Sequence, residues 1–101
     1  MKNYMDLTNR VAIVTGASSG LGYAFSKALA ENGAKVAAFA RRIEKLNALK
    51  EQIEAAGGVC LPVQCDVSKE EDVVNGVQKV IDTFGKIDIL VNNAGAIKMC
   101  P

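Results

Sequence analysis

The chain has 101 residues, of which 50% are hydrophobic and 23% charged, and its formal net charge is +1. This length and balance allow one domain with a buried core and are unlike those of a disordered protein. The near-neutral charge and the few aromatic residues argue against a nucleic-acid surface, and no apolar run approaches the ~20 residues that cross a bilayer. Because residues 1–10 lack the apolar core of a signal peptide, we expect a cytoplasmic protein.

The three cysteines, Cys60, Cys65 and Cys100, form no C-x-x-C pair, and the chain has no histidine. A zinc site or a Cys-His nucleophile would therefore lack its second ligand or its base. We expect no metal site, and we expect Cys60 and Cys65 to be buried free thiols.

The first predicted strand is Val11–Thr15, and a glycine-rich turn leads from it into a helix that ends at Asn32–Gly33. The unbroken apolar character of this strand is typical of a strand covered on both faces. Glycine after the last periodic position is a common helix end. The apolar spacing within the helix predicts one buried stripe, made of Leu21, Ala24, Phe25, Ala28 and Leu29.

The turn between this strand and helix predicts an anion site. Backbone N–H groups and the helix dipole point out of a helix N-terminus, and glycine lets phosphate approach the backbone. The glycine spacing is not G-x-G-x-x-G, and no Gly-Lys-Ser/Thr follows, so the turn is not a P-loop. We predict that a dinucleotide pyrophosphate binds here, and an ordinary glycine-rich turn is the alternative. The candidate binding residues are Thr15, Gly16, Ser18, Ser19, Gly20, Leu21 and Gly22.

A second strand is predicted at Lys35–Ala40 and a second helix at residues 42–56, ended by Gly57–Gly58. The helix carries a buried stripe of Ile43, Leu46, Leu49, Ile53 and Ala56. A third strand covers Val59–Cys65, and Pro62 within it indicates a sheet edge.

The segment Ser68–Glu71 reads as a capping box that opens a third helix, with Ser68 as the N-cap. This helix runs to Phe84, is stopped by Gly85, and carries Val73, Val77, Val80 and Phe84 along one side. A fourth strand is predicted at Ile87–Val91, and residues 96–101 show no periodicity.

Alternation of strands and helices from start to finish predicts a parallel sheet with right-handed crossovers. We predict one α/β domain over residues 1–101, a Rossmann-like doubly wound βαβαβαβ sheet with strand order 3-2-1-4 that is truncated after its fourth strand. The fourth strand would then present an apolar, unpaired edge. Poor solubility or self-association is the expected result.

Ligands bind beyond the carboxyl ends of the strands in this topology, and chemistry-bearing residues follow all four predicted strands. Arg41 and Arg42 follow the second strand, where an NAD-binding protein usually has a carboxylate for the ribose hydroxyl. Guanidinium groups match a phosphate with paired hydrogen bonds, so we predict that NADP(H) is preferred and keep NAD(H) as a second choice. Two solvated arginines at a helix start are the alternative.

Three segments together resemble the short-chain dehydrogenase/reductase family, with bacterial 3-oxoacyl-[acyl-carrier-protein] reductases and gluconate 5-dehydrogenases as the most similar members. These segments are the T-G-x-x-x-G-x-G turn of Thr15–Gly22, then Cys65-Asp66-Val67, and finally Asn92-Asn93-Ala94-Gly95. The resemblance implies that Asp66 bonds the adenine amino group and that Val67 packs nearby. It places Asn93 and the Ala94-Gly95 backbone along the nicotinamide. Asp66 as a turn or capping carboxylate beside Ser68, and Asn93 as a turn residue tied to Thr15, are the alternatives.

The family's catalytic serine, its Tyr-x-x-x-Lys pair and a further asparagine lie beyond the N-N-A-G segment, and this chain stops at Pro101. Tyr23 and Lys27 reproduce the Tyr-x-x-x-Lys spacing, but we predict a surface pair on the helix face opposite Leu21 and Phe25. No catalytic residue is therefore predicted.

The resemblance implies the cofactor-binding part of an oxidoreductase that moves a hydride between nicotinamide and a carbonyl or secondary alcohol. This part should be inactive by itself. Members of the family are usually homo-oligomers, but the helices that usually form their interfaces are absent from this chain. A stand-alone nucleotide-binding module and an inert truncated gene product are the alternatives.

Overall fold

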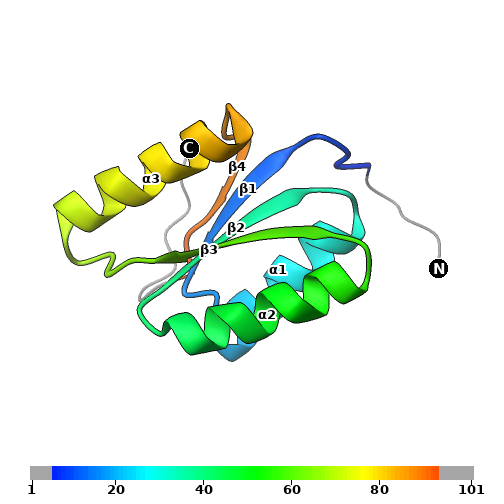
Figure 1. Ribbon diagram of the computed structural model, residues 1–101, viewed down its shortest axis with the longest axis horizontal. Helices are drawn as coiled ribbons and strands as arrows, with labels where there is room; N and C mark the ends of the chain where they lie inside the picture. The colour runs from blue at the N-terminus through cyan, green and yellow to red at the C-terminus, as the bar shows by residue number, and fades with distance from the viewer. Residues whose placement is uncertain (1–5, 94–101) are drawn as a thin grey trace.

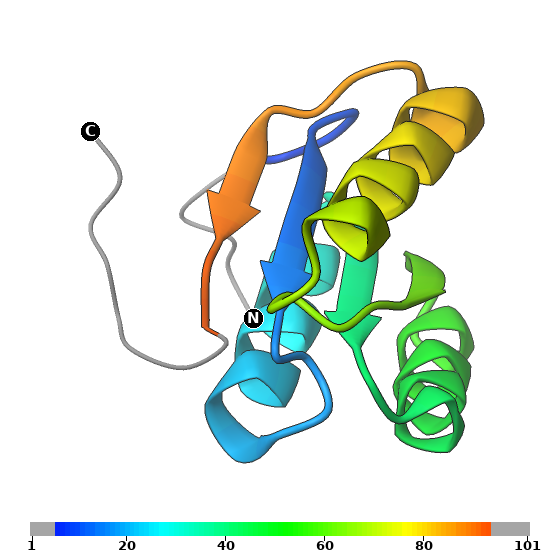
Figure 2. The same cartoon turned by 90° about the vertical axis from the view of Figure 1, so that its left-hand side faces the viewer.

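The computed structural model describes residues 6–93, which form a four-stranded parallel sheet between two helical layers (Figure 1; Figure 2). The elements are β1 (Val11–Thr15), α1 (Gly20–Glu31), β2 (Lys35–Ala40), α2 (Ile43–Ala55), β3 (Val59–Gln64), α3 (Glu70–Phe84) and β4 (Ile89–Val91). Helices α1 and α2 cover one face of the sheet and α3 lies on the other, as Figure 2 shows. The strand order β3-β2-β1-β4 confirms the predicted Rossmann-like α/β fold, with Pro62 in an edge strand.

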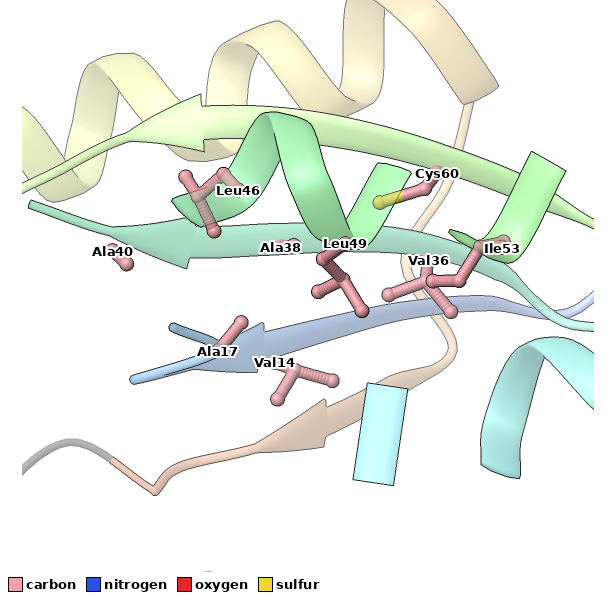
Figure 3. Close-up of a cluster of buried hydrophobic side chains, with 9 residues drawn as sticks. All are labelled: Val14, Ala17, Val36, Ala38, Ala40, Leu46, Leu49, Ile53 and Cys60. Carbon is pink, nitrogen blue, oxygen red and sulfur yellow. The ribbon is translucent and has the colours of Figure 1, made fainter. Parts of the chain in front are cut away.

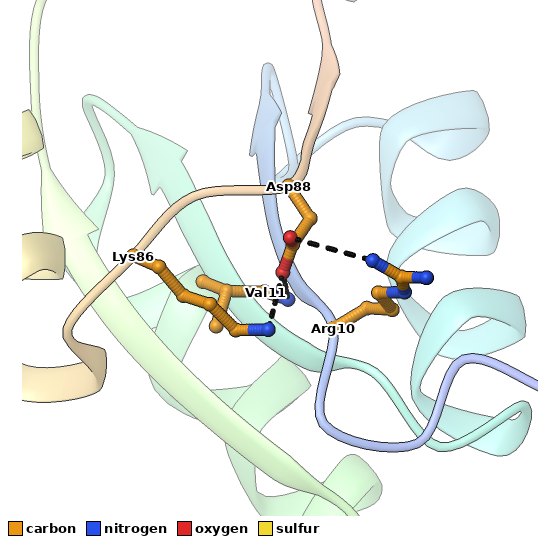
Figure 4. Close-up of polar contacts among 4 residues, drawn as sticks. All are labelled: Arg10, Val11, Lys86 and Asp88. Carbon is orange, nitrogen blue, oxygen red and sulfur yellow. Dashed lines mark hydrogen bonds and ion pairs between the residues drawn. The ribbon is translucent and has the colours of Figure 1, made fainter.

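Strand β4 begins two residues later than predicted. The reason is that the side chain of Asp88, and not a backbone carbonyl, accepts the N–H of Val11. The Asp88 N–H donates to the Val11 carbonyl oxygen at 2.8 Å. Figure 4 shows the carboxylate of the same residue, whose Oδ2 accepts the Val11 N–H at 2.9 Å. Arg10 and Lys86 form ion pairs with the same carboxylate. Asp88 therefore fastens the start of β4 to the start of β1, and the regular pairing begins only at Ile89.

The capping box predicted for α3 is wrong. Lys69 is the N-cap residue, and no side chain caps the helix. The Ser68 hydroxyl and N–H both donate to Asp66 Oδ1, at 2.6 and 3.0 Å. An aspartate two residues before a serine closes an Asx turn, so Ser68 bonds the carboxylate behind it instead of the helix ahead of it.

The buried face predicted for α1 is also wrong. Gly22 and Ser26 are the buried residues of this helix, whereas Leu21 is 55% and Phe25 41% exposed. The helix approaches the sheet so closely that a Cβ on Gly22 would overlap the Gly16 carbonyl oxygen. Small residues therefore face the sheet, and the Ser26 hydroxyl is satisfied by the Gly22 carbonyl at 2.8 Å. Ala24 and Ala28 are exposed with the two large residues.

Tyr23 is not the surface residue that we expected. It is partly buried and packs against the core between the sheet and the α1–α2 layer, together with Leu29 and Ala30. The stripes of α2 and α3 are confirmed, except that Ala56 is exposed. The α1–α2 core is drawn in Figure 3 and consists of Val14, Ala17, Val36, Ala38, Ala40, Leu46, Leu49, Ile53 and Cys60.

Cys60 and Cys65 are both buried free thiols, as predicted, and they lie in the cores on opposite faces of the sheet. Burial raises the pKa of Cys60 to about 11, which keeps it protonated. Burial also raises the pKa of Cys65, with Asp72 and Asp66 adding to the effect. Cys100 lies outside the described residues. Across residues 6–93 there is no group of side chains suited to hold a metal ion, and no helix is long and apolar enough to span a bilayer.

Candidate functional site

All four strands point their carboxyl ends toward one edge of the sheet (Figure 2), and an open pocket of about 440 Å³ lies there. Residues that follow each of the four strands contribute to its wall. The lining residues are Gly16, Ser18, Ser19, Phe39, Ala40, Arg41, Arg42, Cys65, Asp66, Val67, Ser68 and Asn93. This pocket is where the sequence predicted a ligand.

The pocket brings together most of the predicted binding residues, namely Gly16, Ser18, Ser19, Arg41, Arg42, Asp66, Val67 and Asn93. Thr15, Gly20, Leu21 and Gly22 do not line it, and Ala94 and Gly95 lie outside the described residues. Sequence reasoning missed four lining residues: Phe39, Ala40, Cys65 and Ser68. Their position at or just beyond the ends of two predicted strands was the signal that could have identified them.

The glycines of the β1–α1 turn have three different environments. Gly16 has a φ of 63°, in the left-handed region that favours glycine, and its carbonyl accepts the Ser19 hydroxyl at 3.1 Å. Gly22 is needed for packing, because a Cβ there would also lie 2.8 Å from Asn93 Nδ2. A Cβ on Gly20 would meet no atom within 4 Å. Gly20 therefore leaves open space at the first residue of α1, where helix N–H groups can meet an anion.

Arg41 and Arg42 are the two residues between β2 and α2, and both are exposed. Arg42 is the N-cap residue of α2 and has an extended backbone. Both arginines line the pocket, and the positive end of the α2 helix dipole lies at Arg42. The arrangement favours an anionic group on the ligand at this position.

Asp66 lines the pocket after β3 and also makes the turn that was its alternative role. Hydrogen bonds from the Ser68 hydroxyl and N–H lower the pKa of Asp66, and the charges of Arg41 and Lys69 lower it further. The carboxylate is therefore ionised at neutral pH and can only accept hydrogen bonds. A ligand that bonds it must bring a donor.

The end of β4 is tied to Thr15 by both asparagines, so the alternative role considered for Asn93 is also observed. The Thr15 hydroxyl donates to Asn92 Oδ1 at 3.0 Å and accepts the Asn93 N–H at 2.9 Å. Asn92 supplies the side chain of this tie, and Asn93 supplies only its backbone. The tie places the Asn93 side chain over Gly22 and at the wall of the pocket.

Known proteins share both the sequence and the architecture of this chain. The family model described as short chain dehydrogenase matches residues 10–101. The chain is 48% identical over 90 residues to farnesol dehydrogenase of Aedes aegypti, an alignment that covers 88% of this chain and 37% of that protein. It is 41% identical over 98 residues to the short-chain dehydrogenase/reductase homolog YusS of Bacillus subtilis, covering 96% of this chain and 90% of that protein.

A metagenomic short-chain oxidoreductase solved in complex with NADP superimposes with a TM-score of 0.84 at 42% identity, covering 88% of this chain and 40% of that one. The chain spans less than half the length of the farnesol dehydrogenase and of this oxidoreductase, but almost all of YusS. The matched region includes every strand and helix of the structure. The chain belongs to the short-chain dehydrogenase/reductase family.

Proposed function

We propose that this chain binds NADP(H) along the carboxyl edge of its sheet, as the cofactor-binding part of an oxidoreductase. One observation carries the proposal: the β1–α1 turn, the Arg41-Arg42 pair and Asp66 all line a single pocket. The pocket extends from the end of β3 to the end of β4, which is three strand spacings or about 14 Å. An elongated ligand with separate anionic and hydrogen-bonding parts fits such a pocket.

The pyrophosphate would bind the turn of Gly16, Ser18 and Ser19 and the first N–H groups of α1, beside the open space at Gly20. Adenine would lie at the β3 end, where the amino group donates to ionised Asp66 and the ring packs on Val67. The nicotinamide side would lie at the β4 end near Asn93. Thr15, Leu21 and Gly22 would support the turn, and a contact by Ala94-Gly95 stays a prediction.

The preference for NADP(H) rests on Arg41 and Arg42. A charge-assisted hydrogen bond contributes about 1.5–3 kcal/mol, so one good guanidinium–phosphate bond favours NADP(H) by roughly ten- to a hundredfold. No carboxylate at the end of β2 is available to bind the two ribose hydroxyls of NAD(H) instead. Both arginines line the pocket, which supports a role in binding over simple solvation.

The bound nicotinamide would supply the hydride that passes to a carbonyl or comes from a secondary alcohol. The residues of this chain would bind and orient the cofactor. Tyr23 packs on the core and does not line the pocket, so it is no candidate for the proton transfer. We propose that the acid–base groups, and the substrate pocket with them, belong to a part of the protein outside these 101 residues. A cytoplasmic location is part of the same proposal.

Titration of the folded chain with NADPH and with NADH, followed by nicotinamide fluorescence, tests the proposal. We expect both cofactors to bind and NADPH to bind at least tenfold more tightly. Equal affinities would remove the assignment of Arg41 and Arg42, and absence of binding by either cofactor would overturn the function.

A stand-alone nucleotide-binding module is the second candidate, because the YusS protein of Bacillus subtilis has nearly the same extent as this chain. An inert gene product is the third. Translation of the DNA that follows the Pro101 codon separates them. An in-frame serine and Tyr-x-x-x-Lys pair would support the oxidoreductase, and an immediate stop codon would support the module or the inert product.

A further inference from the structure

Gln64 reaches from the end of β3 to the short link that carries both arginines. Its Nε2 donates to the Arg41 carbonyl oxygen at 3.1 Å. Gln64 is also the register partner of Ala40, and the next residue, Cys65, donates its N–H to the Ala40 carbonyl at 2.9 Å. The end of β2 is thus held to β3 by a backbone bond, and the link that follows it is held by the side-chain bond of Gln64.

The side-chain bond matters because of the peptide group that it fixes. The Arg41 carbonyl and the Arg42 N–H belong to one planar trans peptide, so holding the oxygen also sets the direction of the N–H. This peptide joins the two arginines that line the pocket. Gln64 does not line the pocket, and any effect that it has on a ligand must pass through this link.

The carboxylate of Asp66 is close enough to the Arg41 guanidinium to be stabilised by its charge. Asp66 would therefore attract Arg41 in competition with an anionic ligand. A link that could rotate would let Arg41 move toward Asp66 and away from the ligand. The Gln64 bond opposes that movement by fixing the backbone from which the Arg41 side chain extends.

We propose that Gln64 is a positioning residue for recognition of NADP(H). By holding the Arg41–Arg42 peptide, it would keep the two arginines in place for the 2′-phosphate on the adenosine ribose. This inference rests on the proposed function and names the residue that supports its cofactor preference. NADH lacks only the 2′-phosphate on the adenosine ribose, so we expect its binding to depend much less on where the guanidinium groups lie.

The experiment compares the chain with Gln64→Leu, which keeps the size of the side chain but removes the donor, and Gln64→Glu. Dissociation constants for NADPH and NADH are measured at one salt concentration, and thermal melts confirm that each variant is folded. Gln64→Leu should weaken NADPH binding about three- to tenfold, the size expected for one hydrogen bond, and change NADH binding less than about twofold. Gln64→Glu should weaken NADPH binding further, because its carboxylate cannot donate to the Arg41 carbonyl and its negative charge attracts the guanidinium groups away from the ligand, and added salt should recover the part that is due to the charge.

Gln78→Leu is the matched control, since Gln78 also donates a side-chain bond, to Asp82 Oδ1 at 2.8 Å, but lies on α3 away from the pocket. This control should leave both affinities unchanged. Equal losses for NADPH and NADH in Gln64→Leu would show a purely structural role and overturn the proposal, as would unchanged NADPH binding. Failure of the unaltered chain to bind either cofactor, or to prefer NADPH, is seen before any variant is made and would instead overturn the proposed function.

Discussion

The two faces of the sheet differ in how completely they are covered. Two helices pack side by side on one face, where Leu46 and Leu49 are fully buried. The other face has only α3, which packs mainly on β2 and β3. Beside it an apolar groove of about 370 Å³ remains over β1 and β4 and includes Ile13, Val77 and Leu90. The handedness of the crossovers explains the difference, because α3 alone returns along the sheet from β3 to β4.

Most of the exposed large hydrophobic side chains lie on the β4 side of the molecule. They belong to α1, to α3 and to β4 itself. Leu21 and Phe25 lie on the flank of α1 away from α2, since Tyr23 and Ala30 occupy the other flank and pack on the core. Val74 and Ile81, two turns apart on α3, lie on the same side as Val77, which lines the groove. Leu90 in the edge strand is 54% exposed. We expect the covered face to determine stability and the β4 side to determine association.

The largest expected effect comes from truncating a side chain on the covered face. Leu49→Ala should cost about 2–5 kcal/mol of unfolding free energy, because it leaves a cavity between α2 and the sheet. Leu90→Ala on the open side should change the unfolding free energy by less than about 0.5 kcal/mol. Urea unfolding followed by circular dichroism measures both. Equal losses of unfolding free energy in the two variants would contradict the expectation that the covered face determines stability.

Substitutions at two glycines near the β1–α1 turn should affect different properties, one the stability of the covered face and the other the binding of a ligand. Gly22→Ala should destabilise the fold by about 1–3 kcal/mol, since its Cβ would force α1 away from the Gly16 carbonyl. Gly20→Ala should leave stability unchanged, because its Cβ meets open space, but should weaken NADPH binding at least tenfold. Thermal melts and NADPH titrations of both variants check this. Normal NADPH binding by Gly20→Ala would contradict the placement of the pyrophosphate.

The association predicted for the open side depends on the exposed edge of β4. Leu90→Lys should shift the chain toward monomer, since a charged residue on an edge strand opposes pairing with another edge. Sedimentation velocity over a tenfold concentration range measures the change, and Val59→Lys, at an exposed position of the opposite edge strand, is the control. A chain that is already monomeric and melts cooperatively would contradict the expectation.

The sequence predicted the strands better than the helix faces, and the reason is physical. Apart from Thr15 at the end of β1 and Lys35 at the start of β2, these two strands are apolar throughout, so their positions follow from composition. The buried face of α1 was missed because close packing on the sheet selects the small residues Gly22 and Ser26, and a pattern of large apolar residues cannot show this. Those large residues lie beside β4 instead, where nothing in residues 6–93 covers them.

Most of the candidate pocket could be predicted because parallel strands bring their carboxyl ends together regardless of side-chain detail. The tie from Gln64 to the Arg41 carbonyl could not, because it depends on a strand register that only the structure gives. The bond from Ser68 to Asp66 is different, since it lies within one local turn and matches the alternative role considered for Asp66, and it takes the Ser68 hydroxyl that was predicted to cap α3.

The smallest expected effect concerns pH and the start of β4. The Val11 N–H, followed by Lys86, lowers the pKa of Asp88 in the folded chain. A carboxyl whose pKa is lower in the folded than in the unfolded state stabilises the fold above its unfolded pKa of about 4 and loses this contribution as pH falls through the folded value. Asp88→Asn should therefore lower the melting temperature at pH 7, and its difference from the unaltered chain should shrink steadily below about pH 4. The ion pairs of Asp88 with Arg10 and Lys86 are exposed, so 0.5 M salt should weaken them. The hydrogen bond from the Val11 N–H should remain, so salt should remove only a part of the difference in melting temperature. If the difference in melting temperature between the two proteins stayed constant from pH 7 to pH 2, this carboxylate would not hold β4 to β1.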